Sequence, residues 1–276
     1  MNTSAAPLWA GVVGQDDALD LLLHSLERPV HAYLFLGPAG SGKRQTARCF
    51  AAALLCTKGQ CGTCRDCTLV LAAQHPDVLE VERVGAAISA DQANDIVRAA
   101  AMAPIESNRK VLILDEFHLL AAAGAARLLK TIEEPPTGTV FCILADQLTP
   151  DLVTIASRCV RVPFRAIPDH VVAQTLEVEG VARDVAFEAA RVAAGDLDRA
   201  RLLANDVALF DRRRAFASVP HRVNGSGARA AELVDELLGL IDGAAEPLKS
   251  RHEVEVREAD ELAKTLRRGG TARKSL

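Results

Sequence analysis

The stretch that decides the fold reads Tyr33-Leu34-Phe35-Leu36, then Gly37-Pro38-Ala39-Gly40-Ser41-Gly42-Lys43, then Arg44-Gln45-Thr46-Ala47. It places an apolar strand, a glycine-rich turn and a helix start in the order that a phosphate-binding loop requires. Glycines let successive backbone N–H groups point at phosphate oxygens, and the dipole of the following helix favours negative charge there. The stretch therefore predicts a nucleotide site in which Lys43 reaches the β/γ-phosphates. An ordinary glycine-rich turn between a strand and a helix is the alternative.

The residue after Lys43 departs from the pattern of an active NTPase. That position normally carries Ser or Thr, whose hydroxyl holds Mg²⁺. Here it is Arg44, and a guanidinium offers only hydrogen-bond donors, so it is no magnesium ligand. The sequence predicts that ATP or ADP binds at this loop, while Mg²⁺ coordination is in doubt and hydrolysis by this chain is weak or absent.

A second diagnostic run covers residues 110–118 and reads KVLILDEFH. Its four consecutive aliphatic residues predict a strand buried on both faces, as in a parallel sheet. Asp115 and Glu116 end that strand at the edge where α/β sheets bind ligands. Asp115 is expected to support Mg²⁺ through water, and Glu116 to polarise the attacking water as a vestigial Walker B acid. Two solvated acids at the end of a strand are the alternative.

Strands and helices alternate from the glycine-rich loop to residue 164. Ser89 to Gln92 reads as a capping box that opens a helix ending at Met102. A further helix is expected from Leu119 to Ile132. The pattern predicts a doubly wound parallel sheet covered on both faces, with strands at residues 33–36, 78–81, 110–114, 139–144 and 160–164.

Four cysteines form the sharpest local motif: Cys56, Cys61, Cys64 and Cys67 have the spacing C-x4-C-x2-C-x2-C. Four thiolates complete a closed tetrahedral site, so a structural Zn²⁺ is predicted. Disulfides and a redox C-x-x-C pair are the alternatives, although a chain without a secretion signal should stay reduced. His75 is a fifth candidate ligand, and a plain turn residue before a proline is its more common role.

Composition bounds the class of protein. The chain has 276 residues, of which 49% are hydrophobic, so it can bury a sizeable core as one large domain with a smaller one or two. Its formal charge of -4 gives no global reason to expect nucleic-acid binding. No apolar run spans a membrane and no signal peptide is visible, so a cytoplasmic protein with no membrane partner is expected.

The chain after the last strand turns wholly helical. Helices at 169–176, 184–194 and 197–204 predict a small lid domain. An amphipathic segment at 230–241 follows, and the basic tail from Lys264 is expected to fray. The predicted domains are a P-loop domain at 1–166 containing the cysteine module at 56–67, the three-helix lid at 167–206, and a helical region with the basic tail at 207–276.

The order of these motifs resembles the AAA+ subunits of the sliding-clamp loader of bacterial DNA polymerase III. The similarity covers roughly residues 8–205 and adds residues 12–15, 31–35, 128–136 and 157–159 to the motifs above. It implies an AAA+ fold in a cytosolic component of the DNA-directed DNA polymerase III holoenzyme, which opens a ring-shaped clamp and places it on primed DNA. It also implies that Arg158, in Ser157-Arg158-Cys159, is an arginine finger that reaches the ATP site of the adjacent subunit.

Within that family, three ATP-sensing positions differ from the gamma/tau motor. They are Arg44, the run Ala145-Asp146-Gln147 where the motor has a threonine, and the run 195–198, which places Arg199 one position late. The finger run at 157–159 is kept. The combination resembles delta-prime, which implies a stator that completes the site of a neighbour, with gamma/tau motor subunits and the delta subunit as partners.

Two other functions stay open. One is a catalytically active, gamma/tau-like clamp-loader ATPase, and the other is a zinc-stabilised adaptor with an AAA+ fold and no nucleotide function. The family's third domain is a collar of several helices, whereas only about seventy residues follow Ala204. The resemblance therefore implies a short or truncated collar.

Overall fold

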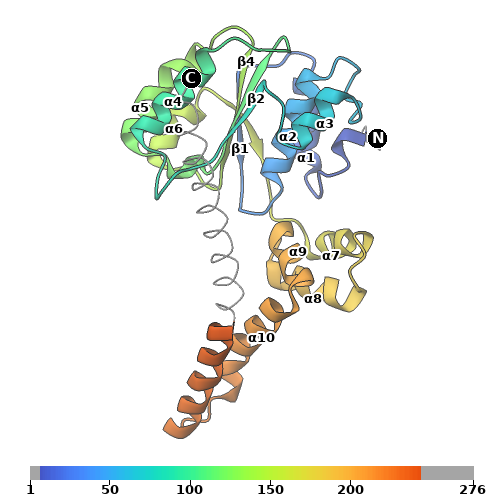
Figure 1. Ribbon diagram of the computed structural model, residues 1–276, viewed down its shortest axis with the longest axis vertical. Helices are drawn as coiled ribbons and strands as arrows, with labels where there is room; N and C mark the ends of the chain where they lie inside the picture. Colours follow the sequence, from blue (N-terminus) through green and yellow to red (C-terminus); the bar gives the residue numbers. More distant parts are fainter. Residues whose placement is uncertain (1–6, 244–276) are drawn as a thin grey trace, which may run out of the picture. The chain divides into compact units, whose positions relative to one another are not determined.

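The computed structural model describes residues 7–243 of the chain, and the basic tail from Lys264 lies outside them (Figure 1). The chain divides into two compact units, Met1–Leu202 and Leu203–Leu276. Between residues 7 and 243, no helix has both the length and the apolar character that crossing a membrane would need.

The first unit is built on one five-stranded sheet, in which every pair of neighbouring strands is parallel. The spatial order is β2-β3-β4-β1-β5, so β1 and β4 lie next to each other although about a hundred residues separate them in sequence. The strands are β1 (Ala32–Leu36), β2 (Val78–Val81), β3 (Lys110–Leu114), β4 (Thr139–Ala145) and β5 (Val160–Pro163). The expected parallel α/β sheet is confirmed.

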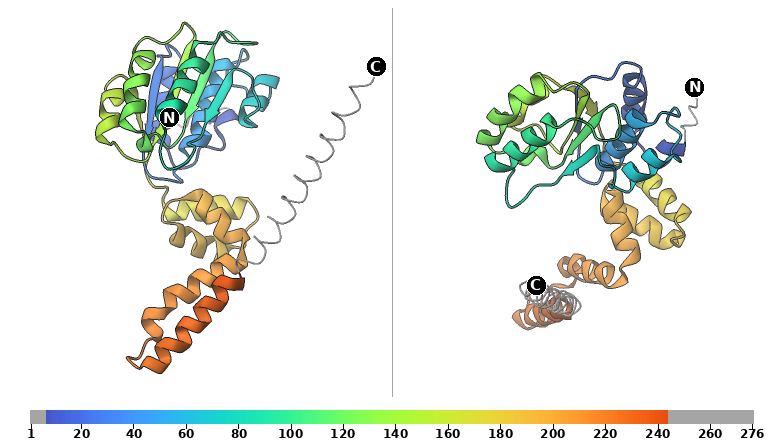
Figure 2. Two further views of the ribbon diagram at one scale, coloured as in Figure 1. Left: turned by 60° about the vertical axis from the view of Figure 1, so that its left-hand side comes forward. Right: turned by 45° about the horizontal axis from the view of Figure 1, so that its top comes forward.

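Helices cover both faces of this sheet (Figures 1 and 2). One face carries α1 (Asp16–Ser25), α2 (Lys43–Leu55) and α3 (Arg65–Leu71), and the other carries α4 (Ala90–Ala101), α5 (Ala122–Glu133) and α6 (Pro150–Ala156). Short 3₁₀ helices are η1 (Pro7–Trp9) and η2 (Phe117–Leu119). Further along the chain come α7 (Asp169–Val178), α8 (Arg183–Ala193), α9 (Leu197–Asn205) and α10 (Val207–Arg222).

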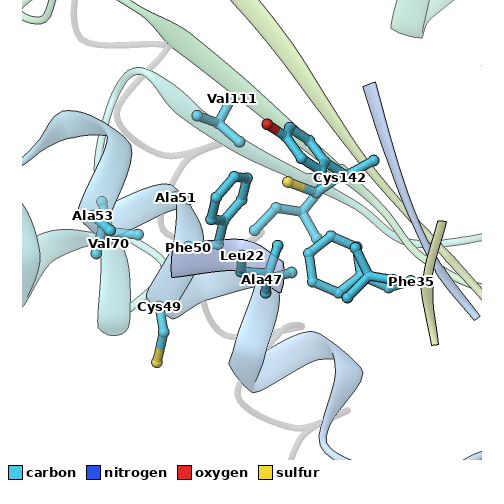
Figure 3. Close-up of a cluster of buried hydrophobic side chains, with 14 of the residues drawn as sticks. Leu22, Phe35, Ala47, Cys49, Phe50, Ala51, Ala53, Val70, Val111 and Cys142 are labelled. Atoms are coloured by element: carbon cyan, nitrogen blue, oxygen red, sulfur yellow. The ribbon is translucent and has the colours of Figure 1, made fainter. Parts of the chain in front are cut away.

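Two hydrophobic clusters, one on each face, hold the layers together. All residues of β3 and β4 are buried, as expected for parallel strands covered on both sides. Figure 3 shows part of the cluster beneath α2, where Phe50 and Ala47 pack with Phe35 and Leu22. The ring of Phe50 also meets Tyr33 edge to face, with centroids 4.7 Å apart. This packing anchors the strand and the helix that flank the glycine-rich loop.

Several expected helix boundaries need correction. The helix expected from Leu119 begins at Ala122, because Phe117–Leu119 forms a 3₁₀ turn and Leu120 is extended. Only half of the expected capping box forms: Ser89 Oγ accepts from the Gln92 backbone N–H at 3.2 Å, while the Gln92 side chain donates to Glu82 O. The helix α3 was not expected, and α10 lies in the region at 207–276 that was expected to be helical without individual bounds.

The helices after the sheet follow the expected pattern in part. α7, α8 and α9 cover the three predicted segments, and Gly180 and Gly195 have φ +95° and +86° at the two breaks, where L side chains are disfavoured. In the second unit, residues 227–243 are helical and Arg222 pairs with Glu236 at 2.5 Å. The predicted domain boundaries at 166 and 206 stay a prediction.

Candidate nucleotide site and cysteine cluster

The glycine-rich loop joins β1 to α2 at the carboxyl edge of the sheet. Gly40 and Gly42 have φ +67° and +83°, and a Cβ added to Gly37 would lie 2.3 Å from Phe164 O, so all three positions require glycine. The backbone N–H groups of Gly40, Gly42 and Lys43 donate to no atom of the described residues. Unpaired amides at the start of a helix form a nest that suits phosphate oxygens.

Lys43 is the first residue of α2, and it is only 7% exposed. Its Nζ donates to Gly37 O and Pro38 O at 2.7 Å each, and to Asp146 Oδ1 at 2.9 Å. All three protons of the ammonium are therefore engaged within the protein. A phosphate that binds here must compete with the Asp146 carboxylate for this cation.

Arg44 lies across the carboxylate predicted to support Mg²⁺. Its Nε donates to Asp115 Oδ2 at 3.0 Å, its Nη2 contacts the same oxygen, and its Nη1 donates to Glu82 Oε1 at 2.7 Å. Burial alone would lower the pKa of Arg44, but the hydrogen bond and charge of Asp115 raise it above its ordinary value. Arg44 is thus a permanent cation held against Asp115.

The donor set does not fit Mg²⁺. The ion needs oxygen ligands in near-ideal octahedral geometry, and the position after Lys43 offers a guanidinium where a hydroxyl is needed. The guanidinium also covers the Asp115 oxygen that a hydrated ion would approach. A nucleotide fits better, because the amide nest supplies free donors for its phosphates and Lys43 supplies a positive charge beside them.

The other acid of the 115–116 pair is also held by a cation. Glu116 Oε2 accepts from Arg83 Nε at 3.1 Å, and Glu116 itself has φ +49°, a left-handed conformation that is uncommon outside glycine. The structure therefore brings the predicted acids beside the loop, but it pairs both of them with arginines of this chain.

A cleft of about 640 Å³ lies over the loop. Apolar side chains of Val13, Ile167 and Leu197 line part of it, so the cleft extends from the loop to the start of α9. The backbone N–H of Leu197 donates to Gly40 O at 3.2 Å, which ties α9 directly to the loop. Arg201 rather than Arg199 reaches this cleft, where it pairs with Glu179 and Asp198.

Sequence reasoning missed the role of Gln15. Its side-chain N–H groups donate to Ser41 O at 3.1 Å and Arg165 O at 2.7 Å, and its Oε1 accepts from Arg165 N at 3.1 Å. Gln15 thereby links the N-terminal segment, the glycine-rich loop and the end of the sheet. Its sequence signals are a position just ahead of α1 and a place in the run at 12–15, and neither indicates contacts with residues 26 and 150 positions away.

The four cysteines lie together as the spacing predicted. Their sulfur atoms are all within 4.8 Å of one another, with Cys56 at 3.7 Å from Cys61 and 3.9 Å from Cys64, and all four are free thiols. Tetrahedral Zn²⁺ with Zn–S of about 2.3 Å sets its sulfurs about 3.8 Å apart, so the cluster has the dimensions of such a site. Backbone N–H groups of Thr63 and Cys64 lower the pKa of Cys61 to about 6, which favours the thiolate.

His75 does not join this cluster, so of its two candidate roles the turn residue holds and the fifth ligand does not. The ring is buried, its Nδ1 accepts from the Asp77 backbone N–H at 3.1 Å, and its Nε2 lies 3.8 Å from Asp66. The turn before β2 holds the histidine near Asp66, the residue that lies between Cys64 and Cys67 in the sequence.

Arg158 follows α6 and precedes β5, an edge strand. Its Nε contacts Glu133, and its Nη1 donates to Thr154 O at 2.7 Å and Ser157 Oγ at 3.0 Å. The local acid beside Arg158 is thus Glu133, at the end of α5. The side chain is 38% exposed.

The register of the sheet separates Arg158 from the glycine-rich loop. Val160 pairs with Tyr33 near the amino end of β1, whereas the loop follows the carboxyl end of that strand. At about 3.3 Å per residue, the two sites are roughly 15–20 Å apart along the strands. The guanidinium therefore serves no phosphate held by its own loop.

Comparison with known proteins places this geometry in a family. A family model described as "DNA polymerase III, delta subunit" matches residues 14–168, more than half of the chain. The chain is 42% identical over 137 residues to DNA polymerase III subunit delta' of Pseudomonas aeruginosa, covering 48% of this chain and 42% of that protein. It is 36% identical over 199 residues to subunit gamma/tau of Mycobacterium tuberculosis, covering 68% of this chain and 34% of that protein.

The chain thus spans about a third to two fifths of the length of these relatives. Among solved structures, a gamma subunit-related protein of Thermotoga maritima matches with a TM-score of 0.45 at 19% identity, over 83% of this chain and 77% of that one. A RuvB protein of the same organism matches with a TM-score of 0.48 at 17% identity, over 82% and 70%. The chain belongs to the DNA polymerase III delta-subunit family and is related to its delta-prime and gamma/tau subunits.

Proposed function

We propose that this chain is a delta-prime-like stator of the DNA polymerase III sliding-clamp loader. In this role it turns over little ATP itself and supplies Arg158 to the ATP site of a neighbouring gamma/tau subunit. Its partners are gamma/tau and the delta subunit, and it reaches the sliding clamp and primed DNA through the complex, in the cytoplasm. The cysteine cluster holds a structural Zn²⁺.

The observation that carries this proposal is the pairing of Arg44 with Asp115. Hydrolysis in P-loop NTPases needs Mg²⁺ to bridge the β- and γ-phosphates, and a hydroxyl and an acid to hold it. In this chain the hydroxyl is missing and the acid is taken by a guanidinium. A neighbouring subunit must therefore provide the turnover in a complex that contains this chain.

The position of Arg158 supports action on another subunit. Arg158 lies near the amino end of the strands, whereas the chain's own loop lies at their carboxyl end. Its guanidinium is partly exposed. A finger stabilises the negative charge that develops on the transferred phosphoryl group, and it is worth about 10³–10⁵ in rate. The contact with Glu133 is an exposed pair, of the kind that contributes about 0–1 kcal/mol, so a phosphate can displace it.

The test is Arg158→Ala in a complex reconstituted with the gamma/tau and delta subunits. ATP turnover and clamp loading should fall by about tenfold or more, while the fold of this chain stays unchanged. Arg158→Lys should rescue little, because a point charge cannot replace the bidentate fork. Arg161→Ala, an exposed arginine on β5 three residues away, is the matched control. Equal turnover by the Arg158→Ala and wild-type complexes would refute the trans role.

A second candidate function is an active, gamma/tau-like ATPase. The open amides of Gly40 and Gly42 and the identity to gamma/tau subunits favour it. DNA-stimulated turnover by the isolated chain would separate it from the stator. The zinc-stabilised adaptor requires the opposite result, no measurable nucleotide affinity together with no effect of Arg158→Ala on any partner.

A further inference from the structure

The feature behind this inference is the guanidinium that stands beside Asp115, where a magnesium site would need an open carboxylate. Arg44 is the second residue of α2, directly after the lysine that completes the loop. Its contact with Asp115 and its bond to Glu82 hold one positive charge next to the amide nest. That charge belongs to the chain, so no chelator removes it.

We propose that this loop binds a nucleoside diphosphate without any divalent cation, because Arg44 supplies the positive charge that Mg²⁺ would bring. The inference deepens the stator proposal and rests on its nucleotide site. It is specific to the position after Lys43, since the remaining donors of the loop are those of any phosphate-binding loop.

The charges around the loop explain why a metal is dispensable. A bare carboxylate at Asp115 would repel a polyphosphate, and in P-loop NTPases the metal ion neutralises that charge. Here Arg44 compensates Asp115, and Arg83 compensates Glu116. An arriving diphosphate therefore meets the amide nest and Lys43 without two uncompensated acids beside them.

The same surroundings select a diphosphate over a triphosphate. Asp146 already engages Lys43, and its side chain is 37% exposed toward the cleft. Asp196 packs so close to the loop that a Cβ added to Gly40 would lie 1.9 Å from its carboxyl group. A further phosphoryl group would bring more negative charge close to these acids without a metal ion to screen it.

The experiment measures binding of fluorescent methylanthraniloyl-ADP to the full chain, once with excess EDTA and once with excess Mg²⁺. The dissociation constants should agree within about twofold, and the triphosphate should bind more weakly than the diphosphate in EDTA. Lys43→Ala should remove binding, which assigns the signal to this loop. Binding that requires Mg²⁺, or no binding in either buffer, would overturn the inference.

Variants at position 44 test the assignment to Arg44. Arg44→Thr restores the hydroxyl, so its binding should become metal-dependent, about tenfold weaker in EDTA than in Mg²⁺. Arg44→Lys keeps the charge and should keep the metal independence. Arg98→Thr, which removes an exposed arginine of α4 outside the cleft, is the matched control and should also keep it. If Arg44→Thr binds equally well in EDTA and Mg²⁺, Arg44 is not the substitute.

Failure of the metal-independent binding and failure of the stator proposal would appear in different measurements. Metal-independent binding is read on the isolated chain at the loop, whereas the finger is read as turnover by the complex at Arg158. If nucleotide binding at the loop needs Mg²⁺ while ATP turnover by the complex still depends on Arg158, only the present inference is overturned. If binding is metal-independent while Arg158→Ala leaves ATP turnover by the complex unchanged, only the stator proposal is overturned.

Discussion

At the scale of single residues, the main feature of the site is a set of ion pairs. They engage the lysine and the acids that were predicted to contact a nucleotide or its metal ion. Lys43 bonds Asp146, Arg44 contacts Asp115 and Arg83 bonds Glu116. Each pair joins an acid at the carboxyl edge of the sheet to a cation of this chain. The result is a loop with phosphate-binding geometry, in which the acids predicted to support a metal ion and to activate water are already engaged.

Asp77 offers a single-residue test of the fold next to the cysteine cluster. This buried carboxylate accepts from the backbone N–H groups of Ile105, Glu106 and Ser107, and these bonds outweigh its burial and lower its pKa. Asp77→Asn should therefore cost about 1–3 kcal/mol of unfolding free energy at neutral pH. Denaturant unfolding measures this cost, with Asp20→Asn, an exposed aspartate of α1, as the control.

The pH dependence of that effect has a definite sign. A carboxyl whose pKa is lower in the folded than in the unfolded state stabilises the protein above its unfolded pKa of about 3.9. The stabilisation by Asp77 is lost as the pH falls through its folded pKa, so wild type and Asp77→Asn should converge in stability at strongly acidic pH. A difference that stays constant from pH 7 to that range would contradict the assignment.

At the scale of elements, the cysteine module is held together by its own backbone. Cys64 Sγ accepts from the Cys67 backbone N–H at 3.5 Å, so one thiol both faces the cluster and caps the amino end of α3. Trp9 of η1 donates through its ring N–H to the Gln60 side chain at 2.8 Å, which ties the loop to the N-terminal segment. The module is thus attached outside the sheet strands.

The corresponding prediction concerns zinc and Cys64. Metal analysis of protein prepared under reducing conditions should find about one zinc per chain, and Cys64→Ser should lose most of it. The far-ultraviolet circular dichroism of that variant should be close to wild type, because serine also caps a helix and the strands are untouched. Cys159→Ser, a free thiol outside the cluster, should keep its zinc. Zinc-free wild-type protein would refute the site.

At the scale of the whole molecule, the three positions predicted to sense ATP come from separate parts of the first unit. Arg44 is the second residue of α2, Asp146 follows β4, and Asp196 caps α9 by accepting from the Arg199 backbone N–H at 2.9 Å. All three meet around the same loop although they are far apart in sequence. On the stator proposal, the expected loss of turnover is therefore spread over several parts of the fold.

This distribution predicts the outcome of a reversion. Arg44→Thr restores a magnesium ligand, yet ATP turnover should remain well below that of a gamma/tau subunit measured in parallel, because Asp146 still engages Lys43 and the run at 195–198 is unchanged. Steady-state hydrolysis by purified protein, with Lys43→Ala to report contaminating ATPase, is the measurement. Turnover equal to gamma/tau would show that Arg44 alone silences the site.

The local order of the chain was readable from the sequence. The strand, loop and helix at 33–55, the buried strand ending at Asp115 and the cysteine spacing all depend on neighbours within a dozen residues or so, whose periodicity and glycine positions are visible directly. Where the local signal was ambiguous, the sequence misplaced the helix start expected at Leu119 and gave no bounds for α10 with its internal Pro220.

The partners of the charged groups were decided only by the tertiary structure. Arg44 and Asp115 are 71 positions apart, Lys43 and Asp146 are 103, and both pairs exist because the sheet order brings the ends of β1, β3 and β4 together. Arg158 meets Glu133 for the same kind of reason, since α5 and α6 pack on one face of the sheet. Spacing along the chain can place a charge at the end of a strand, but only the packing of the strands determines which opposite charge it meets.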